Sequence, residues 1–347
     1  MKVWQIATGM TSRDYRDLFF DHDVMIIGPS QYGSALETDY SGGSGTAIGN
    51  QIDSFAHDPL PGDRVVMRFS RSIIGVGQIP SGDHSQYSFD EAYRTIYGWD
   101  LRHCRRVKWG PRGRLGALRK VTFAARQQPT FTRVHEPDIV RLVEHLPSSW
   151  FHRPLKKRPY HDAALYSEEE LEADLFTAGI SSKNIHDIYA ALRQAGNLCT
   201  WYWNQQGGER PTEHEVVSHM VLPLFLGLGW SHQQMAVEWN RIDVAFFKGT
   251  PTKEQNCIMV LEAKGIYEGL GDVLDQPIRY VRDLGLTRTR YIVVTNGQIL
   301  LVYGKTRGSW NQTPIAFLDV SCLQKQYALP RRTNPVKVLV MLQPSAV

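Results

Sequence analysis

The sequence predicts a two-domain protein of α+β or α/β class: a small N-terminal β-barrel, a helical connector, and a C-terminal mixed sheet flanked by helices. Three observations support this. The chain has 347 residues, which is enough for two domains. Short strands with closely spaced turns fill residues 1–125, and helical patterns dominate residues 126–211. Over residues 212–347 the order is helix, strand, strand, helix and strand, which is typical of a mixed sheet covered by helices.

Residues 1–125 are expected to be mainly β. Gly28-Pro29 and Gly62-Asp63 are turn signals, and the Gly- and Ser-rich segment Ser41–Gly49 is expected to be a loop. Alternating or apolar runs between turns predict strands over Val3–Ala7, Met25–Ile27, Arg64–Ser70 and Ile73–Ile79. Several short strands at this spacing are typical of a small barrel.

The helical connector, residues 126–211, carries no pattern that points to chemistry. Trp150–His161 is rich in Pro, Lys and Arg and is expected to be a linker. Capping residues and helical spacing predict helices over Pro137–His145, from Ser167 to Gly179, and over Asn184–Ala195, where Gly196 should end the last helix.

In residues 212–347, Thr212 should cap a helix that runs to about Gly227. A second helix is expected at Leu270–Leu284, and the Asn296-Gly297 pair predicts a hairpin turn. One strand is expected within Gln234–Phe247, and one each over Ile258–Lys264, Arg290–Val294 and Ile299–Tyr303, with Ile315–Val320 and Val336–Met341 as possible edge strands.

The charge distribution is more informative than the formal net charge of +4. From Arg102 to Arg126 there are nine Lys or Arg residues and no Asp or Glu. Such a stretch indicates contact with phosphate groups. A solvated basic strand without a partner is the alternative. The residues that we expect to contact DNA phosphate are Arg102, Arg105, Arg106 and Lys108.

Cysteine spacing and hydropathy indicate the compartment. The four cysteines lie far apart, with no Cys-x-x-Cys pair, which argues against a zinc knuckle and a disulfide framework. The first ten residues lack the apolar core of a signal peptide, and no apolar run approaches the length of a membrane span. We therefore expect a cytoplasmic protein with reduced thiols and no membrane partner.

The most specific pattern is Asp243, followed nineteen residues later by Glu262-Ala263-Lys264. Glu262 and Lys264 lie two residues apart on a predicted strand and therefore face the same side. A hairpin with the strand that carries Asp243 would bring the two carboxylates together. Carboxylates that converge on rigid strands form an oxygen site for Mg²⁺, for which Mn²⁺ can substitute.

A surface salt bridge on an exposed sheet is the alternative explanation of this pattern. The neighbours Val260-Leu261 and Val244-Ala245-Phe246 are apolar, which indicates buried strands. A charge inside such a strand is costly unless it is paired or bound to a metal. Glu215, on the preceding helix, is expected to add a catalytic and metal-binding carboxylate, with Glu213 as its rival.

Residues 213–304 resemble the PD-(D/E)xK nuclease superfamily, and in particular the nuclease domain of type I restriction motor subunits. The matching elements, in order, are Glu215 on a helix, Leu228-Gly229-Trp230, Arg241-Ile242-Asp243, Glu262-Ala263-Lys264, Gln276 with Tyr280, and Thr295-Asn296-Gly297. The set is more specific than any single element. The chain departs from the pattern in lacking a proline before Asp243, and it has no phosphate-binding loop of a motor.

This resemblance implies roles for individual residues. Asp243, Glu262 and the main-chain carbonyl of Ala263 would bind the metal, and Lys264 would be the catalytic lysine. Gln276 would act in or support the catalytic site, and Tyr280, one helical turn away, would lie near the DNA phosphate.

Residues 1–125 resemble the PUA-like group that includes EVE and YTH domains. The matching segments are Trp4-Gln5-Ile6, Ile27–Gly33, Pro61–Val66, Ile74–Ile79 and Arg106–Trp109. Domains of that group hold a flipped, modified base in an aromatic pocket. The resemblance implies a base-binding set made of Ser30, Gln31, Tyr32, Tyr97 and Trp99, although packed core aromatics and turn residues are the alternative for each.

The two resemblances together predict a modification-dependent DNA restriction endonuclease. The first domain would read a modified base, expected to be a cytosine derivative, in double-stranded DNA, and the second would cut nearby with Mg²⁺. A double-strand break needs two active sites, so a homodimer, at least on DNA, is expected. A sequence- or structure-specific nuclease and a non-catalytic nucleic-acid-binding module are the alternatives.

Overall fold

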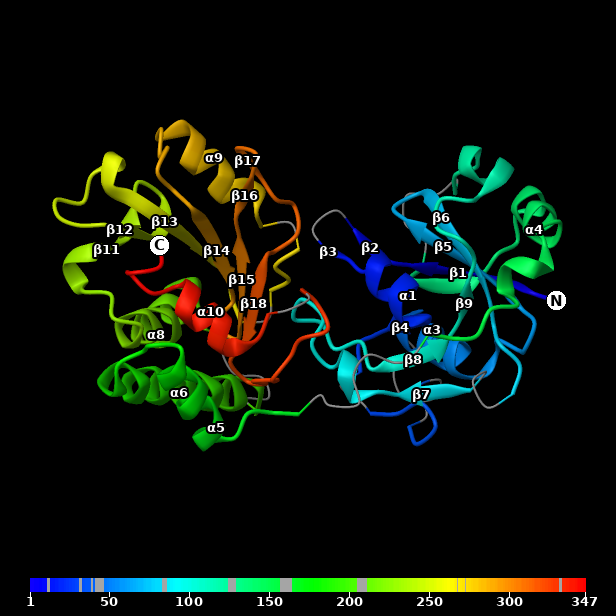
Figure 1. Cartoon of the computed structure of the whole chain (residues 1–347), viewed down its shortest axis with the longest axis horizontal. Coiled ribbons are helices and arrows are strands. Elements are labelled where there is room, and N and C mark those ends of the chain that lie inside the picture. Colours follow the sequence, from blue (N-terminus) through cyan, green and yellow to red (C-terminus); the bar gives the residue numbers. More distant parts are fainter. Residues whose placement is uncertain are drawn as a thin grey trace. The chain divides into compact units, whose positions relative to one another are not determined.

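The computed structural model describes residues 1–10, 13–30, 33–38, 40, 47–82, 86–123, 129–156, 164–204, 211–266, 268–271, 273–330 and 333–347. The chain forms two compact units, Met1–Asp162 and Ala163–Val347 (Figure 1). The predicted boundaries lie after residues 125 and 211. The observed division instead falls within the expected connector, so residues 126–162 belong to the first unit and residues 163–211 to the second.

The first unit contains two main sheets. A five-stranded sheet has the order β10-β1-β5-β6-β9, in which β1 and β5 are parallel and the other pairs antiparallel. Its strands are β1 (Val3–Ala7), β5 (Arg64–Phe69), β6 (Ser72–Gln78), β9 (Lys108–Trp109) and β10 (Phe131–Arg133). A three-stranded antiparallel sheet and a short hairpin add β4 (Val24–Ile27), β8 (His103–Arg106), β7 (Tyr87–Phe89), β2 (Gly9–Met10) and β3 (Arg13–Asp14).

The predicted closed barrel is wrong for the described residues. The four predicted strands form, as β1, β4, β5 and β6. However, β10 and β9 are the two edges of an open sheet, so the five-stranded sheet does not close. Strand β4 pairs with β8, and β8 with β7, in a sheet of their own. Alternation along a strand identifies its buried face, but not the strand with which each edge pairs, so the sequence pattern cannot distinguish a barrel from two open sheets.

Helices of the first unit are α1 (Arg16–His22), α3 (Ala47–His57) and α4 (Pro137–Glu144), with 3₁₀ turns η2 (Glu91–Tyr93), η3 (Gly116–Lys120) and η4 (Ser148–Phe151). Helix α4 confirms its prediction. The expected loop Ser41–Gly49 is different: its residues 41–46 lie outside the described part, and its last three residues begin α3. Helix α3 buries Ile52, Phe55 and Ala56 on one face. The polar residues between them make this helical spacing difficult to recognise in the sequence.

The second unit contains a six-stranded mixed sheet of order β11-β12-β13-β14-β15-β18 (Figure 1). Strands β13 and β14 are parallel, and the other pairs are antiparallel. The strands are β11 (Met235–Trp239), β12 (Ile242–Phe247), β13 (Cys257–Ala263), β14 (Tyr291–Thr295), β15 (Ile299–Tyr303) and β18 (Ala316–Asp319). A separate hairpin joins β16 (Lys305–Thr306) to β17 (Ser309–Trp310). The predicted mixed α/β organisation is confirmed.

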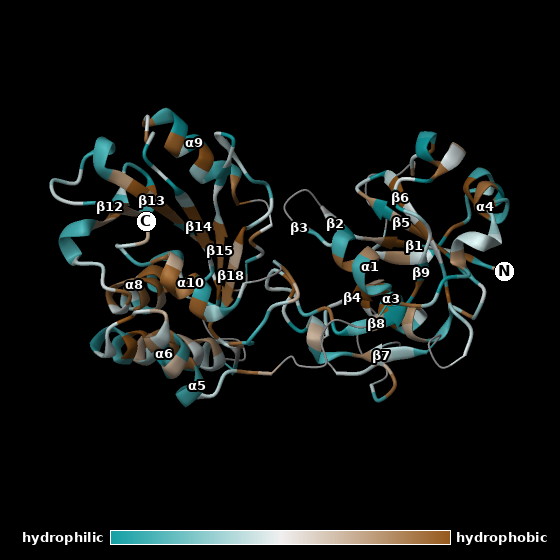
Figure 2. Cartoon of the chain, viewed as in Figure 1, coloured by the Kyte–Doolittle hydropathy of each residue, from teal (hydrophilic) through white to brown (hydrophobic). Residues whose placement is uncertain are grey.

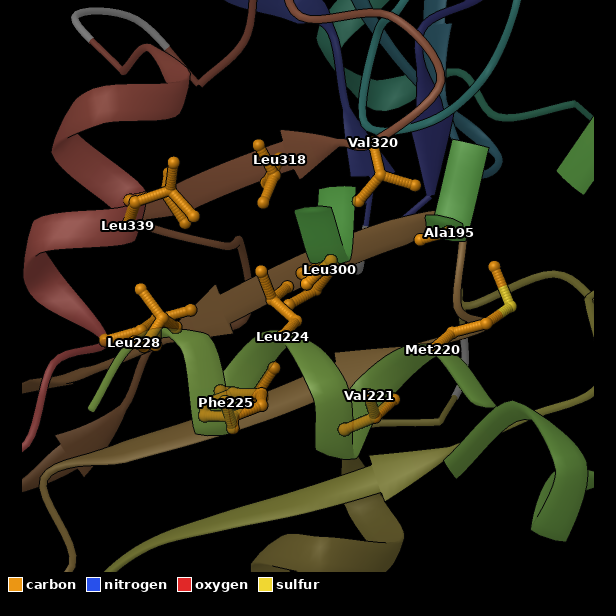
Figure 3. Close-up of a cluster of buried hydrophobic side chains, with 14 of the residues drawn as sticks. Ala195, Met220, Val221, Leu224, Phe225, Leu228, Leu300, Leu318, Val320 and Leu339 are labelled. Atoms are coloured by element: carbon orange, nitrogen blue, oxygen red, sulfur yellow. The ribbon is translucent and has the colours of Figure 1, made fainter. Parts of the chain in front are cut away.

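Helices cover both faces of this sheet, so its central strands are apolar on both sides (Figure 2). One face packs against α5 (Glu168–Thr177), α6 (Ser182–Asn204), α8 (Leu222–Gly227) and α10 (Pro335–Met341), and the other packs against α9 (Asp275–Asp283). A helical run of α7 (Glu213–Val216), the π-helical η5 (Val217–Val221) and α8 crosses the first face. Short 3₁₀ turns η6 (His232–Gln234) and η7 (Glu254–Asn256) lie before β11 and β13. Figure 3 shows Leu224, Phe225, Leu300 and Leu318 in this core.

Three predicted elements of the second unit need correction. Helix α6 continues past Gly196 to Asn204, because its buried neighbours Ala195 and Cys199 anchor both sides of the glycine in the core. Residues 336–341 lie in helix α10 rather than in a strand, since Asn334 caps that helix through a bond from Lys337 N. The segment Gln234–Phe247 contains the two strands of a hairpin.

Candidate active site

Two adjacent strands bring together the carboxylates that the sequence predicts. Strands β12 and β13 are antiparallel with Val244 opposite Leu261, so the same register places Asp243 opposite Glu262. Ala245 and Val260 lie two residues from Asp243 and Glu262 on the same strands, so they share the face of these acids, and both belong to the core cluster under α9. Asp243 and Glu262 therefore project from the α9 face, at the end of the sheet where β13 terminates.

Glu262 is a buried carboxylate with incomplete hydrogen bonding. It is only 1 % exposed. Its Oε1 accepts a hydrogen bond of 2.9 Å from Lys264 Nζ, whereas its buried Oε2 has no hydrogen-bond partner. Burial raises its pKa to about 7, the bond from Lys264 opposes this rise, and repulsion from Asp243 and Glu213 adds to it. One oxygen of this buried carboxylate is therefore left without a hydrogen-bond donor within the described residues.

Asp243 faces a similar electrostatic cost. Its Oδ2 accepts a hydrogen bond of 2.6 Å from the main-chain N–H of Ala263, which fixes the carboxylate against the end of β13. Burial raises the pKa of Asp243, the Ala263 N–H and Lys264 oppose the rise, and repulsion from Glu213 and Glu238 adds to it. Two partly desolvated acids thus lie on adjacent strands, and both gain from a bound cation.

Lys264 connects the strand to the preceding helix. Its Nζ donates to Glu262 Oε1 at 2.9 Å and to Glu213 Oε1 at 3.1 Å. Burial acts to lower the pKa of Lys264, but the bonds to Glu262 and Glu213 outweigh it, so the pKa is raised. Its main-chain N–H donates to Thr295 O at 2.8 Å, which continues the β13–β14 ladder beyond Ala263. The side chain is therefore a fixed, charged ammonium group.

The helix carboxylate at this site is Glu213, whereas the sequence prediction favoured Glu215. The Glu215 carboxylate accepts from Thr212 N at 2.7 Å and from Thr212 Oγ1 at 3.0 Å, and Thr212 Oγ1 accepts from Glu215 N. This is a capping box, which holds Glu215 at the start of its own helix. The pattern Thr-x-x-Glu in the sequence is the signal that could have assigned Glu215 to this role.

The turn after β14 supports both the helix and the loop after Lys264. A Cβ on Gly297 would lie 2.6 Å from Met220 Sδ and 3.0 Å from Val216 Cγ1, and Gly297 has a φ of +83°. Only glycine allows the helix of Glu213 to approach this turn so closely. Asn296 Nδ2 donates to Ile266 O at 3.2 Å and so fixes the loop. The predicted Thr-Asn-Gly element thus positions the site from two sides.

Gln276 and Tyr280 of α9 are bonded to each other, with Gln276 Nε2 donating to Tyr280 Oη at 3.1 Å. Both are half-buried, and their helix covers the sheet face from which Asp243 and Glu262 project. A supporting role for Gln276 and a phosphate contact for Tyr280 stay predictions.

The sequence pattern does not identify two further residues near the site, Glu238 and His214. Glu238 on β11 forms an ion pair with His214 of α7, with 2.9 Å between Oε1 and Nδ1, and it acts electrostatically on Asp243. Nothing in the sequence pattern connects residues 214 and 238, because the pairing depends on how α7 approaches the β11–β12 hairpin.

The residues present fit a hard divalent cation. Asp243, Glu262 and the Ala263 carbonyl supply oxygen donors, and the buried, unbonded Oε2 of Glu262 offers a free lone pair. In the described part of the chain, no three side chains of His, Cys, Asp or Glu gather into a metal-binding group. A site with two carboxylates suits Mg²⁺, which usually keeps several water ligands.

The predicted base-binding residues that are described have different surroundings. Gln31 and Tyr32 lie outside the described residues. Ser30 is buried and is bonded to neighbouring main chain: its Oγ donates to Asp100 O at 3.3 Å and accepts from Arg102 N at 2.9 Å. Tyr97 is buried and stacks on Tyr15 at 6.2 Å between ring centroids. Trp99, at 39 % exposed, is the most accessible of the three that are described.

Most cations of the predicted phosphate-binding set are engaged inside the first unit. Arg102 forms ion pairs of 2.7 Å with both Asp100 and Glu91. Arg105 is buried and donates to the main-chain oxygens of Phe55, Ala56 and Pro59, at the C-terminal end of α3. Arg106 is buried and donates to Lys156 O. Lys108 is partly exposed, and its side chain makes no hydrogen bond or ion pair within the described structure.

The reason for this difference is the strand on which these residues lie. Residues of β8 are buried on both faces, so its arginines serve carbonyl groups that would otherwise lack donors. The basic segment ends at Arg126, which lies outside the described residues.

Comparisons with known proteins add no family. No family model, curated protein or solved structure matches this chain. None of the described helices has the length and apolar character needed to cross a bilayer.

Proposed function

We propose that this chain is a metal-dependent DNA endonuclease whose second unit hydrolyses phosphodiester bonds. The observation that carries this proposal is the buried Glu262, which lies opposite Asp243, bonds Lys264 and keeps one oxygen without a partner. A carboxylate in that state destabilises the fold unless a cation binds it, which is a sign of a functional site. The motif resemblance to PD-(D/E)xK nucleases supports the same assignment.

Each residue has a defined task in this proposal. Mg²⁺ held by Asp243, Glu262 and the Ala263 carbonyl would offset charge on the scissile phosphate and lower the pKa of the attacking water. Lys264 has a raised pKa and so stays charged, which suits it to stabilise the negative charge that develops on the phosphate rather than to accept a proton. Glu213 and Glu262 hold its ammonium group from two sides.

The first unit would direct this activity to modified DNA. Its resemblance to base-reading domains and the accessible Trp99 support a role in holding a flipped base, expected to be a cytosine derivative. A tethered nuclease would then act at a high effective concentration around the bound base. A double-strand break requires two such sites, so we include a homodimer on DNA in the proposal.

A second candidate function is a nuclease that reads sequence or DNA structure rather than modification. The internal bonds of Ser30, Arg102 and Arg105 favour it, because these residues are occupied within the first unit and not presented to a base or a phosphate. The two candidates share the active site and differ only in what brings DNA to it.

The test is cleavage by the purified full chain with Mg²⁺ on matched DNA substrates. The panel would contain unmodified DNA, 5-methylcytosine, 5-hydroxymethylcytosine, its glucosylated form and N6-methyladenine. Cleavage of one modified substrate, lost in Lys264→Ala but kept in Lys248→Ala, is the expected result. Lys248 is an exposed lysine at the opposite end of β12 and serves as the matched control.

Other outcomes distinguish the alternatives. Equal cleavage of all substrates, lost in Lys264→Ala, would leave the nuclease and replace the modified-base reader with the second candidate. Cleavage by Lys264→Ala at the wild-type rate would refute the assigned site. Binding of DNA without cleavage under every condition would support a non-catalytic module.

A further inference from the structure

The β11–β12 hairpin turn next to Asp243 has an unfavourable backbone. Trp239 pairs with Ile242, so Asn240 and Arg241 are the two central residues of the turn. Their φ angles are +50° and +72°, as a two-residue turn of this type requires at both positions. Asparagine is well tolerated there, but glycine is strongly preferred at the second position. Arg241 occupies that second position at a cost in conformational energy.

A second hairpin in the same unit shows the usual solution. The turn between β16 and β17 has Arg307 and Gly308 as its central residues, with φ angles of +52° and +84°. Glycine thus occupies the second position there. The β16–β17 hairpin follows β15, which runs antiparallel to β14 and away from the Thr295 end of the sheet. Arg307 is therefore an exposed arginine that also has a positive φ, at the first central position of its turn and at the end of the sheet remote from Lys264.

Arg241 is exposed and its guanidinium group is unpaired. Within the described structure it makes no hydrogen bond, ion pair or ring contact. Glu238 lies only three residues away, but its carboxylate pairs with His214 instead. Within the described residues, the Arg241 side chain therefore makes no polar contact that would offset the strain of its backbone.

The electrostatics of the site supply a reason for a cation at this position. The negative charges of Glu213 and Glu238 act on Asp243, and those of Asp243 and Glu213 act on Glu262, while Lys264 donates to Glu262 and Glu213. We call these four acids the carboxylate cluster. The cluster is negative and repels a DNA backbone, which carries one charge per phosphate. Arg241 lies two residues before Asp243, at the end of β12 where the cluster gathers. An unpaired guanidinium beside the cluster can attract a phosphate without being neutralised by it.

We propose that Arg241 is a phosphate-binding residue of the nuclease site, which contacts the DNA backbone beside the bond to be cut. This inference rests on the proposed nuclease function. Glycine would relieve the strain of the turn but could not bind a phosphate. A guanidinium group outside the carboxylate cluster can contact the DNA backbone without pairing with the acids of the cluster.

The test compares the full-length wild type with Arg241→Gly, Arg241→Lys and the matched control Arg307→Gly. The equilibrium constant for a short, labelled duplex of unmodified DNA would be measured at increasing salt, with Ca²⁺ in place of Mg²⁺. Loss of one phosphate contact lowers the slope of log K against log salt concentration by about 0.9. We expect that change in Arg241→Gly, a nearly wild-type slope in Arg241→Lys, and an unchanged slope in Arg307→Gly.

Two further measurements exclude trivial explanations. Arg241→Gly should unfold at the wild-type temperature or above it, because glycine relieves the backbone strain, and in Mg²⁺ it should raise KM for cleavage more than it lowers kcat. If Arg241→Gly binds DNA with the affinity and salt slope of the wild type, the inference about Arg241 is wrong, even when the wild type cuts. If Lys264→Ala cuts as well as the wild type, the proposed function fails first and the inference fails with it.

Discussion

Replacing Glu262 with glutamine should stabilise the metal-free protein while it removes activity. The side chain is 1 % exposed, one of its oxygens has no partner, and the one hydrogen bond that it accepts within the described residues comes from Lys264. Glutamine keeps nearly the same shape and can still accept from Lys264, but it carries no charge to desolvate. The variant therefore removes an unfavourable interaction that only a bound cation offsets in the wild type.

The size of this effect follows from the pKa of Glu262, which burial raises from 4.5 to about 7. A rise in the pKa of an acid on folding means that the folded state binds the proton more tightly. The contribution of Glu262 to stability is therefore full below pH 4.5 and is lost as the pH rises through 7. A shift of about 2.5 units corresponds to about 3 kcal/mol above pH 7.

Urea unfolding in EDTA, followed across this pH range, measures the difference between Glu262→Gln and the wild type. We expect almost none below pH 4.5 and an advantage of the variant of about 3 kcal/mol above pH 7. Glu213→Gln is the matched control, because its partly exposed carboxylate touches the same lysine, and it should change stability by less than about 1 kcal/mol. A variant that is less stable than the wild type above pH 7 would refute the electrostatic reasoning.

Two more predictions concern the rest of the structure. His103 is fully buried, and burial lowers its pKa to about 4. The unfolded chain therefore binds a proton more readily than the folded protein, and the protein should lose about 3 kcal/mol of stability as the pH falls from 6.5 to 4. Urea unfolding of His103→Gln should not show this loss, whereas the control His57→Gln, at an exposed histidine, should show it. Gly297→Ala should cost about 2 kcal/mol and reduce cleavage, since its Cβ would meet Met220 and displace the helix of Glu213. Gly308→Ala, where a Cβ meets nothing within 4 Å, should cost about 1 kcal/mol and leave cleavage unchanged, and equal effects of the two glycine variants would contradict the positioning role.

The core of the candidate site could be predicted from the sequence because it depends on strand geometry alone. Residues two apart on a strand share a face, so Glu262 and Lys264 had to lie together. The apolar residues around Asp243 fixed which strands are central, and the observed β12–β13 register brings the acids opposite each other. Local rules of this kind carry over directly from sequence to structure.

Features that depend on tertiary contacts could not be predicted in the same way. The two acids Glu213 and Glu215 lie in the same helical turn, and the choice between them depends on the capping box and on how closely the Gly297 turn approaches. The sequence predicts a phosphate contact for Arg105 because it shows the charge of this residue, but not the carbonyl groups at the end of α3 that accept its hydrogen bonds. Gly196 was expected to end a helix, but packing of α6 overrides its low helical propensity.

The central claim is that the paired strand carboxylates form a metal-dependent nuclease centre. The most direct test is Mg²⁺-dependent cleavage of the preferred DNA substrate by the wild type, Glu262→Gln and Glu215→Gln, each shown to be folded. We expect Glu262→Gln to bind DNA but no longer to cut it, whereas Glu215→Gln, which disturbs only a helix cap, should cut nearly as well as the wild type. Undiminished cleavage by Glu262→Gln would show that the paired strand carboxylates are not the catalytic centre.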